Sequence, residues 1–158
     1  MSITKLNNLS ISAVTALPSG VGGKVLQVVT ATDNTSRNTS STSFVTASNT
    51  LSVSITPSSA SNKIFIIATF GSWTLSAGML LTIFRGATNL GDSSNGLSWV
   101  YSAGSVSTDI GFASSVSVLD SPSSTSALTY QLYIRTLGGT GYIMEKGKGS
   151  ITAFEIGA

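Results

Sequence analysis

The chain has 158 residues, enough for one domain and too few for two domains with separate cores. Ser and Thr together occupy 50 positions, whereas Asp, Glu, Lys and Arg together occupy only 14. The sequence contains no cysteine and no histidine, which excludes a disulfide framework, a thiolate metal site and the commonest general base. With 41% hydrophobic residues in short runs, the composition is typical of a globular domain rich in β-strands.

The formal net charge of +2 comes from 8 basic and 6 acidic residues that are spread along the chain. A nucleic-acid-binding protein gathers its Lys and Arg on one face, and the only local cluster here, Glu145, Lys146 and Lys148, includes an acid. No apolar run approaches the length of about 18 residues that a membrane-spanning helix needs, and the start lacks a signal-peptide pattern. We therefore expect no nucleic-acid partner, no membrane insertion and no classical export signal.

Residues 1–23 differ from the rest of the chain. Their apolar side chains are spaced among Ser, Thr and Asn, and Pro18 and three glycines close the segment. This spacing predicts neither a stable helix nor a strand that is stable alone. We predict an N-terminal arm that becomes ordered on a partner, and the alternative is a frayed terminus. The side chains expected to anchor the arm are Ile3, Leu6, Leu9, Ile11 and Val14.

From residue 24 to residue 158 the pattern is that of β-strands. Residues 51–56 alternate between apolar and hydroxyl side chains until Pro57 ends the run. Residues 63–70 and 79–84 are apolar on both faces, which predicts central strands that are covered on both sides. Further strands are predicted at 25–29, 97–101, 106–112, 115–119, 128–136, 142–145 and 151–156, and a polar loop or irregular edge is predicted at 30–43.

These strands define the expected architecture of residues 24–158. Roughly nine or ten short strands in one domain, without a convincing helical period, predict a β-sandwich or a jelly roll. The sequence shows no repeat of fixed length, which disfavours a propeller or a solenoid. We therefore expect a single all-β domain that follows the arm.

The titratable residues do not form a recognisable catalytic pattern. No carboxylate lies within three positions of another, and three of the six lie beside Gly, Ser or Asn, where hydrogen bonding in turns explains them. A GKGS stretch at residues 147–150 resembles the end of a phosphate-binding loop, but Gly149 stands where Ser or Thr should bind magnesium. We therefore predict that the protein is not an enzyme and needs no cofactor and no metal.

Aromatic side chains are the remaining candidates for binding. Trp and Tyr rings can stack on sugar faces, but in a domain poor in large side chains they also form core or subunit contacts. We favour core or interface roles for most of them. The exceptions are Trp99 and Tyr101, which follow the Gly- and Ser-rich stretch at 91–98 and are expected to be exposed. Together with Asn95 in that stretch, they are expected to bind a receptor.

Five segments carry a likeness to known proteins. They read ITKLNNLSISAVTALPSG at 3–20, GKVLQVV at 23–29, STSF at 41–44, LSVSITPSSASNKIFI at 51–66 and ITAFEIGA at 151–158. Together they resemble a family of short virion proteins and fibre-tip domains of tailed bacteriophages, and the first resembles the linker that precedes such domains. The motifs are strand and turn patterns rather than catalytic signatures, and residues 73–120 have no counterpart in the likeness.

The resemblance implies a single jelly-roll β-sandwich, similar to the C1q and tumour-necrosis-factor domains, with an extended N-terminal arm. It also implies a homotrimer in the virion, which is assembled in the host cytoplasm. The alternating strands at 128–136 and 151–156 are expected to supply part of the trimer axis, with Tyr133 and Phe154 among the contacts.

Three functions remain to be compared. The first is a capsid decoration or cement protein whose arm docks on the major capsid protein, and it is favoured by the brevity of an arm plus one domain. The second is a tail-fibre or spike tip that attaches to a tail protein and binds a host-surface glycan. The third, a polysaccharide-degrading enzyme, would need paired carboxylates and is disfavoured.

Overall fold

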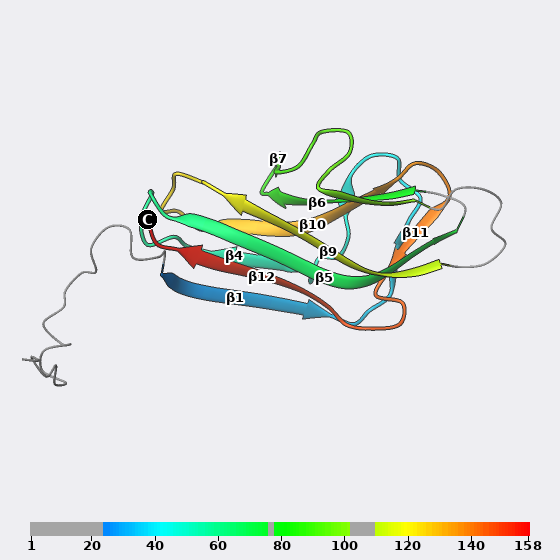
Figure 1. The fold of residues 1–158 in the computed structure, drawn as a ribbon, viewed down its shortest axis with the longest axis horizontal. Helices are drawn as coiled ribbons and strands as arrows, with labels where there is room; N and C mark the ends of the chain where they lie inside the picture. The colour runs from blue at the N-terminus through cyan, green and yellow to red at the C-terminus, as the bar shows by residue number, and fades with distance from the viewer. Residues whose placement is uncertain (1–23, 76–77, 102–109) are drawn as a thin grey trace, which may run out of the picture.

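The computed structural model describes residues 24–75, 78–101 and 110–158. Within these residues the chain forms twelve β-strands and no helix, and the strands build two sheets that pack face to face (Figure 1). The all-β sandwich predicted from the sequence is therefore confirmed. The arm at 1–23, with all five of its predicted anchoring side chains, lies outside the described residues.

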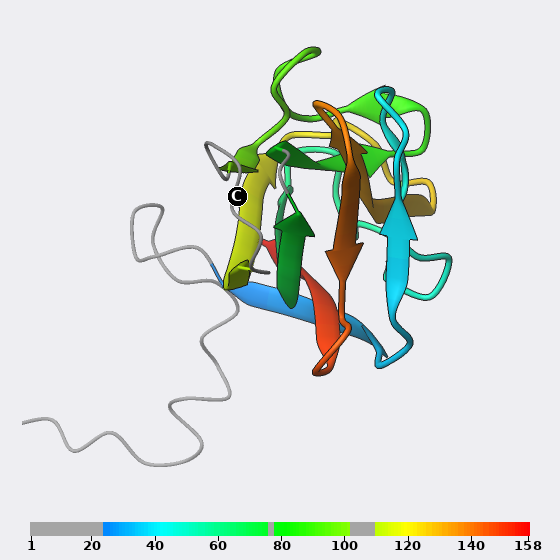
Figure 2. The same ribbon diagram turned by 90° about the vertical axis from the view of Figure 1, so that its right-hand side faces the viewer.

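One sheet, which we call sheet I, contains the first and the last strand of the fold. Its strands are β1 (Val25–Asp33), β2 (Arg37–Thr39), β5 (Lys63–Leu75), β9 (Ile110–Asp120), β11 (Thr140–Ile143) and β12 (Gly149–Ile156). The long strand β5 is central: it pairs with β9 on one side, and on the other side with β12 and then with β11. β1 pairs with β12, and β2 pairs with β11, which Figure 2 shows between β2 and the end of β5.

The other sheet, sheet II, is built around two neighbouring strands, β6 (Gly78–Arg85) and β10 (Leu128–Thr136). Its remaining strands are β3 (Val45–Thr46), β4 (Ser52–Ile55), β7 (Thr88–Asn89) and β8 (Ser98–Tyr101). β3 and β4 pair with the free side of β10, and β7 and β8 pair with the free side of β6. All pairs in both sheets are antiparallel, so successive side chains alternate between the core and the outer face.

The core lies between the two sheets and is filled by the inward side chains of each strand. In β12, Ile151 and Ala153 are buried, whereas the residues between them are half-buried on the outer face. In β10, Tyr130, Leu132 and Ile134 are buried in the same alternation. In β10 and β12 a period of two in the sequence therefore became one buried face and one outer face, whereas β6 is buried on both faces from Gly78 to Ile83.

The polar segment at 30–43, for which we predict a loop or an irregular edge, is partly strand and lies at both edges of sheet I, so the loop alternative is wrong for 30–33 and 37–39. β1 continues from Val29 to Asp33, and its last four residues pair with Ser150, Gly149 and their neighbours in β12. β2 follows at Arg37. A partner strand satisfies the backbone of this segment, and its threonines are β-branched, so the polar side chains face outwards without breaking the strand.

The two strands predicted at 106–112 and 115–119 are also corrected, because β9 runs without interruption from Ile110 to Asp120. Residues 102–109 lie outside the described part of the chain. β9 stays paired with β5 from one end to the other, through Ala113 and Ser114. The Ser114 hydroxyl points inwards and forms a hydrogen bond with the Ser72 hydroxyl. The small side chains of Ala113 and Ser114 therefore do not interrupt β9, because β5 supplies the backbone hydrogen bonds of the strand.

Candidate interaction surfaces

A row of apolar side chains crosses the outer face of sheet I near one end. The strand register places Val28 beside Phe154, Phe154 beside Phe65, and Phe65 beside Leu119. The outer two, Val28 and Leu119, are 55% and 53% exposed, and the two phenyl rings between them are half-buried with their centroids 6.2 Å apart. We call these four residues the apolar row.

Further apolar side chains surround the row. Val25 and Leu26 at the start of β1 are exposed, and Ile67 and Ile156 are half-buried on the same face. β5 was predicted to be covered on both sides, and its central place in the sheet agrees with that pattern. Among the described residues, however, only its inner face meets a second layer of structure. A contiguous exposed apolar patch of this kind marks an interaction surface.

A buried carboxylate holds the outward position of Phe154. Glu155 points into the sandwich and is 2% exposed, and it accepts hydrogen bonds from the backbone N–H of Ser58 (2.6 Å), the Ser58 hydroxyl (2.7 Å) and Asn62 Nδ2 (2.7 Å). Burial acts to raise the pKa of Glu155, but the hydrogen bonds from Asn62 and Ser58 outweigh it, so the pKa lies below its usual value. Because neighbours in a strand face opposite ways, an inward Glu155 keeps Phe154 outward.

A second buried carboxylate holds Leu119 in the same way. Asp120 accepts hydrogen bonds from Arg85 Nη1 on both of its oxygens (2.8 and 2.7 Å) and from the Tyr130 hydroxyl (2.7 Å). Arg85 and Tyr130 belong to sheet II, so this cluster ties the two sheets together. Burial, and then the hydrogen bond to Asp120, raises the pKa of Tyr130, which keeps the phenol a donor.

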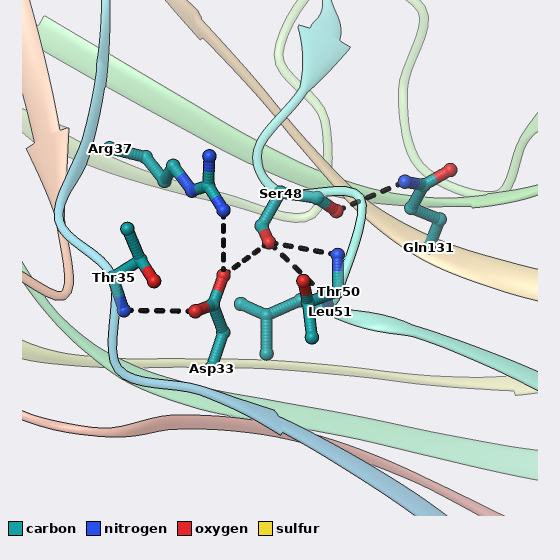
Figure 3. Close-up of polar contacts among 7 residues, drawn as sticks. All are labelled: Asp33, Thr35, Arg37, Ser48, Thr50, Leu51 and Gln131. Carbon is teal, nitrogen blue, oxygen red and sulfur yellow. Dashed lines mark hydrogen bonds and ion pairs between the residues drawn. The ribbon is translucent and has the colours of Figure 1, made fainter.

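A third carboxylate, Asp33, fastens the end of β1 (Figure 3). It accepts hydrogen bonds from the Ser48 hydroxyl (2.5 Å) and the backbone N–H of Thr35 (2.9 Å), and Arg37 lies 3.5 Å away. The hydrogen bond from Ser48, followed by that from Thr35, lowers the pKa of Asp33 to about 2. The Ser48 hydroxyl in turn accepts the backbone N–H of Leu51 (3.3 Å), so β1 is linked to the segment that precedes β4.

The candidate receptor-binding aromatics lie on β8, at an edge of sheet II. Trp99 is 63% exposed and Tyr101 is 54% exposed, as the sequence predicts, and their ring centroids are 5.7 Å apart. Asn95 is exposed in the preceding turn, where its backbone N–H donates to Asp92 Oδ1 (2.6 Å). The structure thus brings the two rings together on one edge strand, and a role in receptor binding stays a prediction.

The two residues predicted for the trimer axis lie on different sheets. Phe154 belongs to the apolar row on sheet I, whereas Tyr133 faces outwards from sheet II. There its ring stacks on Phe84, with centroids 4.0 Å apart, and Phe44 contacts the other edge of this cluster at 6.3 Å from Phe84. The guanidinium of Arg135 lies 5.5 Å from the Phe44 ring centroid. Tyr133 and Phe154 therefore belong to two separate surfaces.

Sequence reasoning missed the other three members of the apolar row. Val28, Phe65 and Leu119 are far apart in the sequence, and only the pairing of β1, β12, β5 and β9 aligns them. The available signal was the run at 63–70, which is apolar on both faces although the chain forms a sandwich of only two layers. The outer face of such a strand needs a partner surface, which the described residues of the domain do not provide.

Comparison with known proteins found no match: the chain fits no family model, and no curated protein is similar to it. In the part of the chain that the structure describes, no helix is long and apolar enough to span a membrane. Within the same residues, no three acidic side chains gather in a group that could hold a metal ion. The candidate surfaces are therefore assessed on their geometry and chemistry alone.

Proposed function

We propose that this protein is a homotrimeric structural protein of a bacteriophage virion and that its sandwich is a jelly roll similar to the C1q and tumour-necrosis-factor domains. The resemblance of the segments at 23–29, 41–44, 51–66 and 151–158 to virion proteins of tailed bacteriophages supports the virion assignment. The strand pairing supports the jelly roll, because a jelly roll is a long hairpin wrapped into two sheets, so that its first strands pair with its last. Here β1 pairs with β12, β4 with β10, β5 with β9 and β6 with β8.

The proposal of a trimer rests on the apolar row. Specific interfaces bury more than about 1,000 Å² and have an apolar centre within a polar rim. The row, flanked on β5 by the exposed polar residues Lys63 and Thr69, has this composition. Burying apolar surface stabilises an assembly by about 25 cal/mol per Å². Other copies of the same chain are always present together, so they are the partners that we expect to bury the apolar row.

Within the virion we assign the protein to capsid decoration, with residues 1–23 docked on the major capsid protein and the sandwich displayed on the surface. The spaced apolar side chains of the arm support this assignment. A segment of this composition gains order by adding its backbone and side chains to the edge or groove of another protein.

The mass of the protein in solution tests the trimer. Light scattering of the full chain is expected to give about three times the protomer mass of 16.1 kDa. A Leu119→Lys variant places a charge in the apolar row and is expected to shift the mass towards that of one protomer, because an unpaired charge is costly to bury.

Leu137→Lys is the matched control, because Leu137 is 52% exposed and lies outside the row. This variant is expected to keep the mass of the unmodified protein. A mass near 16 kDa for the unmodified chain at micromolar concentration would exclude the trimer. An unchanged mass for a folded Leu119→Lys variant would show that the apolar row is not the interface.

The exposed pair Trp99 and Tyr101 favours a second candidate function, a tail-fibre or spike tip that binds a host-surface glycan. Two tilted aromatic rings on an edge strand present flat apolar surfaces to the solvent, and sugar rings pack on such surfaces through their C–H groups. Loss of glycan binding in a Trp99→Ala variant would support this function.

A further inference from the structure

A pocket of about 430 Å³ opens on sheet I, far from the apolar row. Trp73 is eight residues from Phe65 along β5, or about 26 Å at 3.3 Å per residue, so the pocket and the row are separate surfaces. The volume lies in the range of about 300–1,000 Å³ that small-molecule sites occupy. The lining residues that carry the argument are Gly71 and Trp73 of β5, Gly111 of β9, and Glu145 and Lys146 after β11.

The indole ring of Trp73 forms one wall and has an uncovered side. Across the sheet, Trp73 pairs with Tyr142 of β11 on one side and with Gly111 of β9 on the other. The Tyr142 ring stacks on the indole, with centroids 3.9 Å apart and planes within 3° of parallel. On the opposite side, a Cβ built on Gly111 would meet nothing within 4 Å. Among the described residues, the indole is therefore covered by the Tyr142 ring on one side and open towards the pocket on the Gly111 side.

The floor and the opposite wall complete the pocket. Gly71 also has open space where a Cβ would stand, so two glycines expose a flat stretch of backbone. The backbone N–H of Met144 donates to the Gly71 carbonyl (2.8 Å), and Met144 has a left-handed φ of 58° while its side chain stays buried. This turn carries the exposed Glu145 and Lys146 to the rim of the pocket. A left-handed residue other than glycine costs energy, and such residues gather at binding sites.

We propose that this pocket binds a neutral pyranose ring of a glycan. The open indole side matches the apolar C–H face of the sugar ring, and the glycine floor lets the ring lie close to the sheet. The Glu145 carboxylate accepts hydrogen bonds from hydroxyl groups, and the Lys146 ammonium donates to them. Because the two charges cancel, the rim favours a ligand rich in hydroxyls over a phosphate or a cation. This site goes beyond the proposed virion role and does not depend on trimer formation.

The test is a titration of the isotope-labelled full chain, followed by the amide and indole N–H signals in NMR. The probes are the methyl glycosides of glucose, galactose, mannose and N-acetylglucosamine, and inorganic phosphate serves as the charged comparison. We expect at least one sugar to give saturable shifts of the Trp73 indole N–H and of the Gly71 and Gly111 amides. We expect phosphate to leave these signals unchanged.

The decisive variant is Gly111→Val, which fills the pocket. Open space surrounds the position and β-branched residues suit strands, so the variant is expected to fold and to weaken sugar binding at least tenfold. Ser115→Val is the matched control, since Ser115 is exposed on the same face of the same strand but does not line the pocket. Trp73→Ala is a second variant that is expected to abolish binding.

Three results would overturn the proposal. The first is that none of the four sugars gives saturable shifts at Trp73, and the second is that a folded Gly111→Val variant binds as tightly as the unmodified protein. The third is that the shifts occur at Trp99 and Tyr101 and vanish in Trp99→Ala, which would place the sugar on the edge of sheet II. The mass measured for the same samples reports on the trimer separately, so failure of one proposal is distinguishable from failure of the other.

Discussion

Three of the five acidic residues in the described part of the chain are buried, and each accepts hydrogen bonds from neutral or charged donors. Asp33, Asp120 and Glu155 stand at or near the ends of β1, β9 and β12, where the chain enters or leaves sheet I. An ionised carboxylate is costly to bury unless hydrogen bonds replace its water, and serine, asparagine, tyrosine and arginine side chains supply these bonds here. These three acids therefore stabilise the ends of strands in sheet I.

The low pKa of Asp33 predicts loss of stability in acid. The pKa is about 2 in the folded protein and 3.8 in the unfolded chain, so the unfolded chain takes up the proton first as the pH falls. The stabilisation is complete above about pH 5 and is lost as the pH falls through 3.8 and then through 2, and the lowered pKa of Glu155 acts in the same direction. We expect the urea midpoint to be constant near neutral pH and to fall steeply in this range.

An Asp33→Asn variant is expected to be less stable at neutral pH and to lose less stability in acid than the unmodified protein. Glu145→Gln is the control, because Glu145 is exposed at the rim of the pocket. The urea midpoint of this variant is expected to fall in acid as much as that of the unmodified chain. An equal fall of the urea midpoint in acid for Asp33→Asn and the unmodified protein would show that the ionised Asp33 does not stabilise the fold.

At the scale of elements, β5 connects the core to both proposed sites. Its inward residues, such as Ile64 and Ile66, are fully buried in the sandwich. Among its outward residues, Phe65 belongs to the apolar row and Trp73 lines the pocket. The exposed Thr69 and Gly71 separate the two. One strand therefore keeps two surfaces at a fixed separation.

The arm at 1–23 is the element for which we predict a separable function. Ordering a chain costs about 1–2 kcal/mol per residue, which burial of its spaced apolar side chains and backbone pairing with a partner must offset. Removal of residues 1–20 is expected to leave the trimer folded but unable to join the virion. Size measurements test the trimer, and co-sedimentation with particles tests attachment. Full occupancy of particles by the truncated protein would place the anchor on the sandwich instead.

At the scale of the whole molecule, the proposed trimer predicts a stability that depends on concentration. Association that buries the apolar row stabilises only the folded chain, so mass action raises the melting temperature as the protein concentration increases. We expect the melting temperature of the unmodified protein to rise over a hundredfold range of concentration. The Leu119→Lys variant is expected to melt at one temperature throughout. A constant melting temperature for both proteins would argue for a monomer.

The sequence by itself determined those features that depend on neighbouring residues. The all-β class and the strands at 63–70, 128–136 and 151–156 follow from alternation or from apolar runs, because a strand sorts its side chains by position alone. The exposure of Trp99 and Tyr101 followed from the Gly- and Ser-rich stretch before them. These signals are local, so no knowledge of the partner strands was required.

Only the tertiary structure decided the features that depend on pairing between distant strands. β1 continues to Asp33 and β9 runs unbroken because β12 and β5 offer their backbones, which no local pattern reveals. The same register aligns Phe65 with Leu119 and leaves Trp73 beside Gly111. A shift of one residue would turn each of these side chains to the other face. Register is set by turns and packing across the whole sandwich, and so the apolar row and the pocket could not be predicted from the sequence.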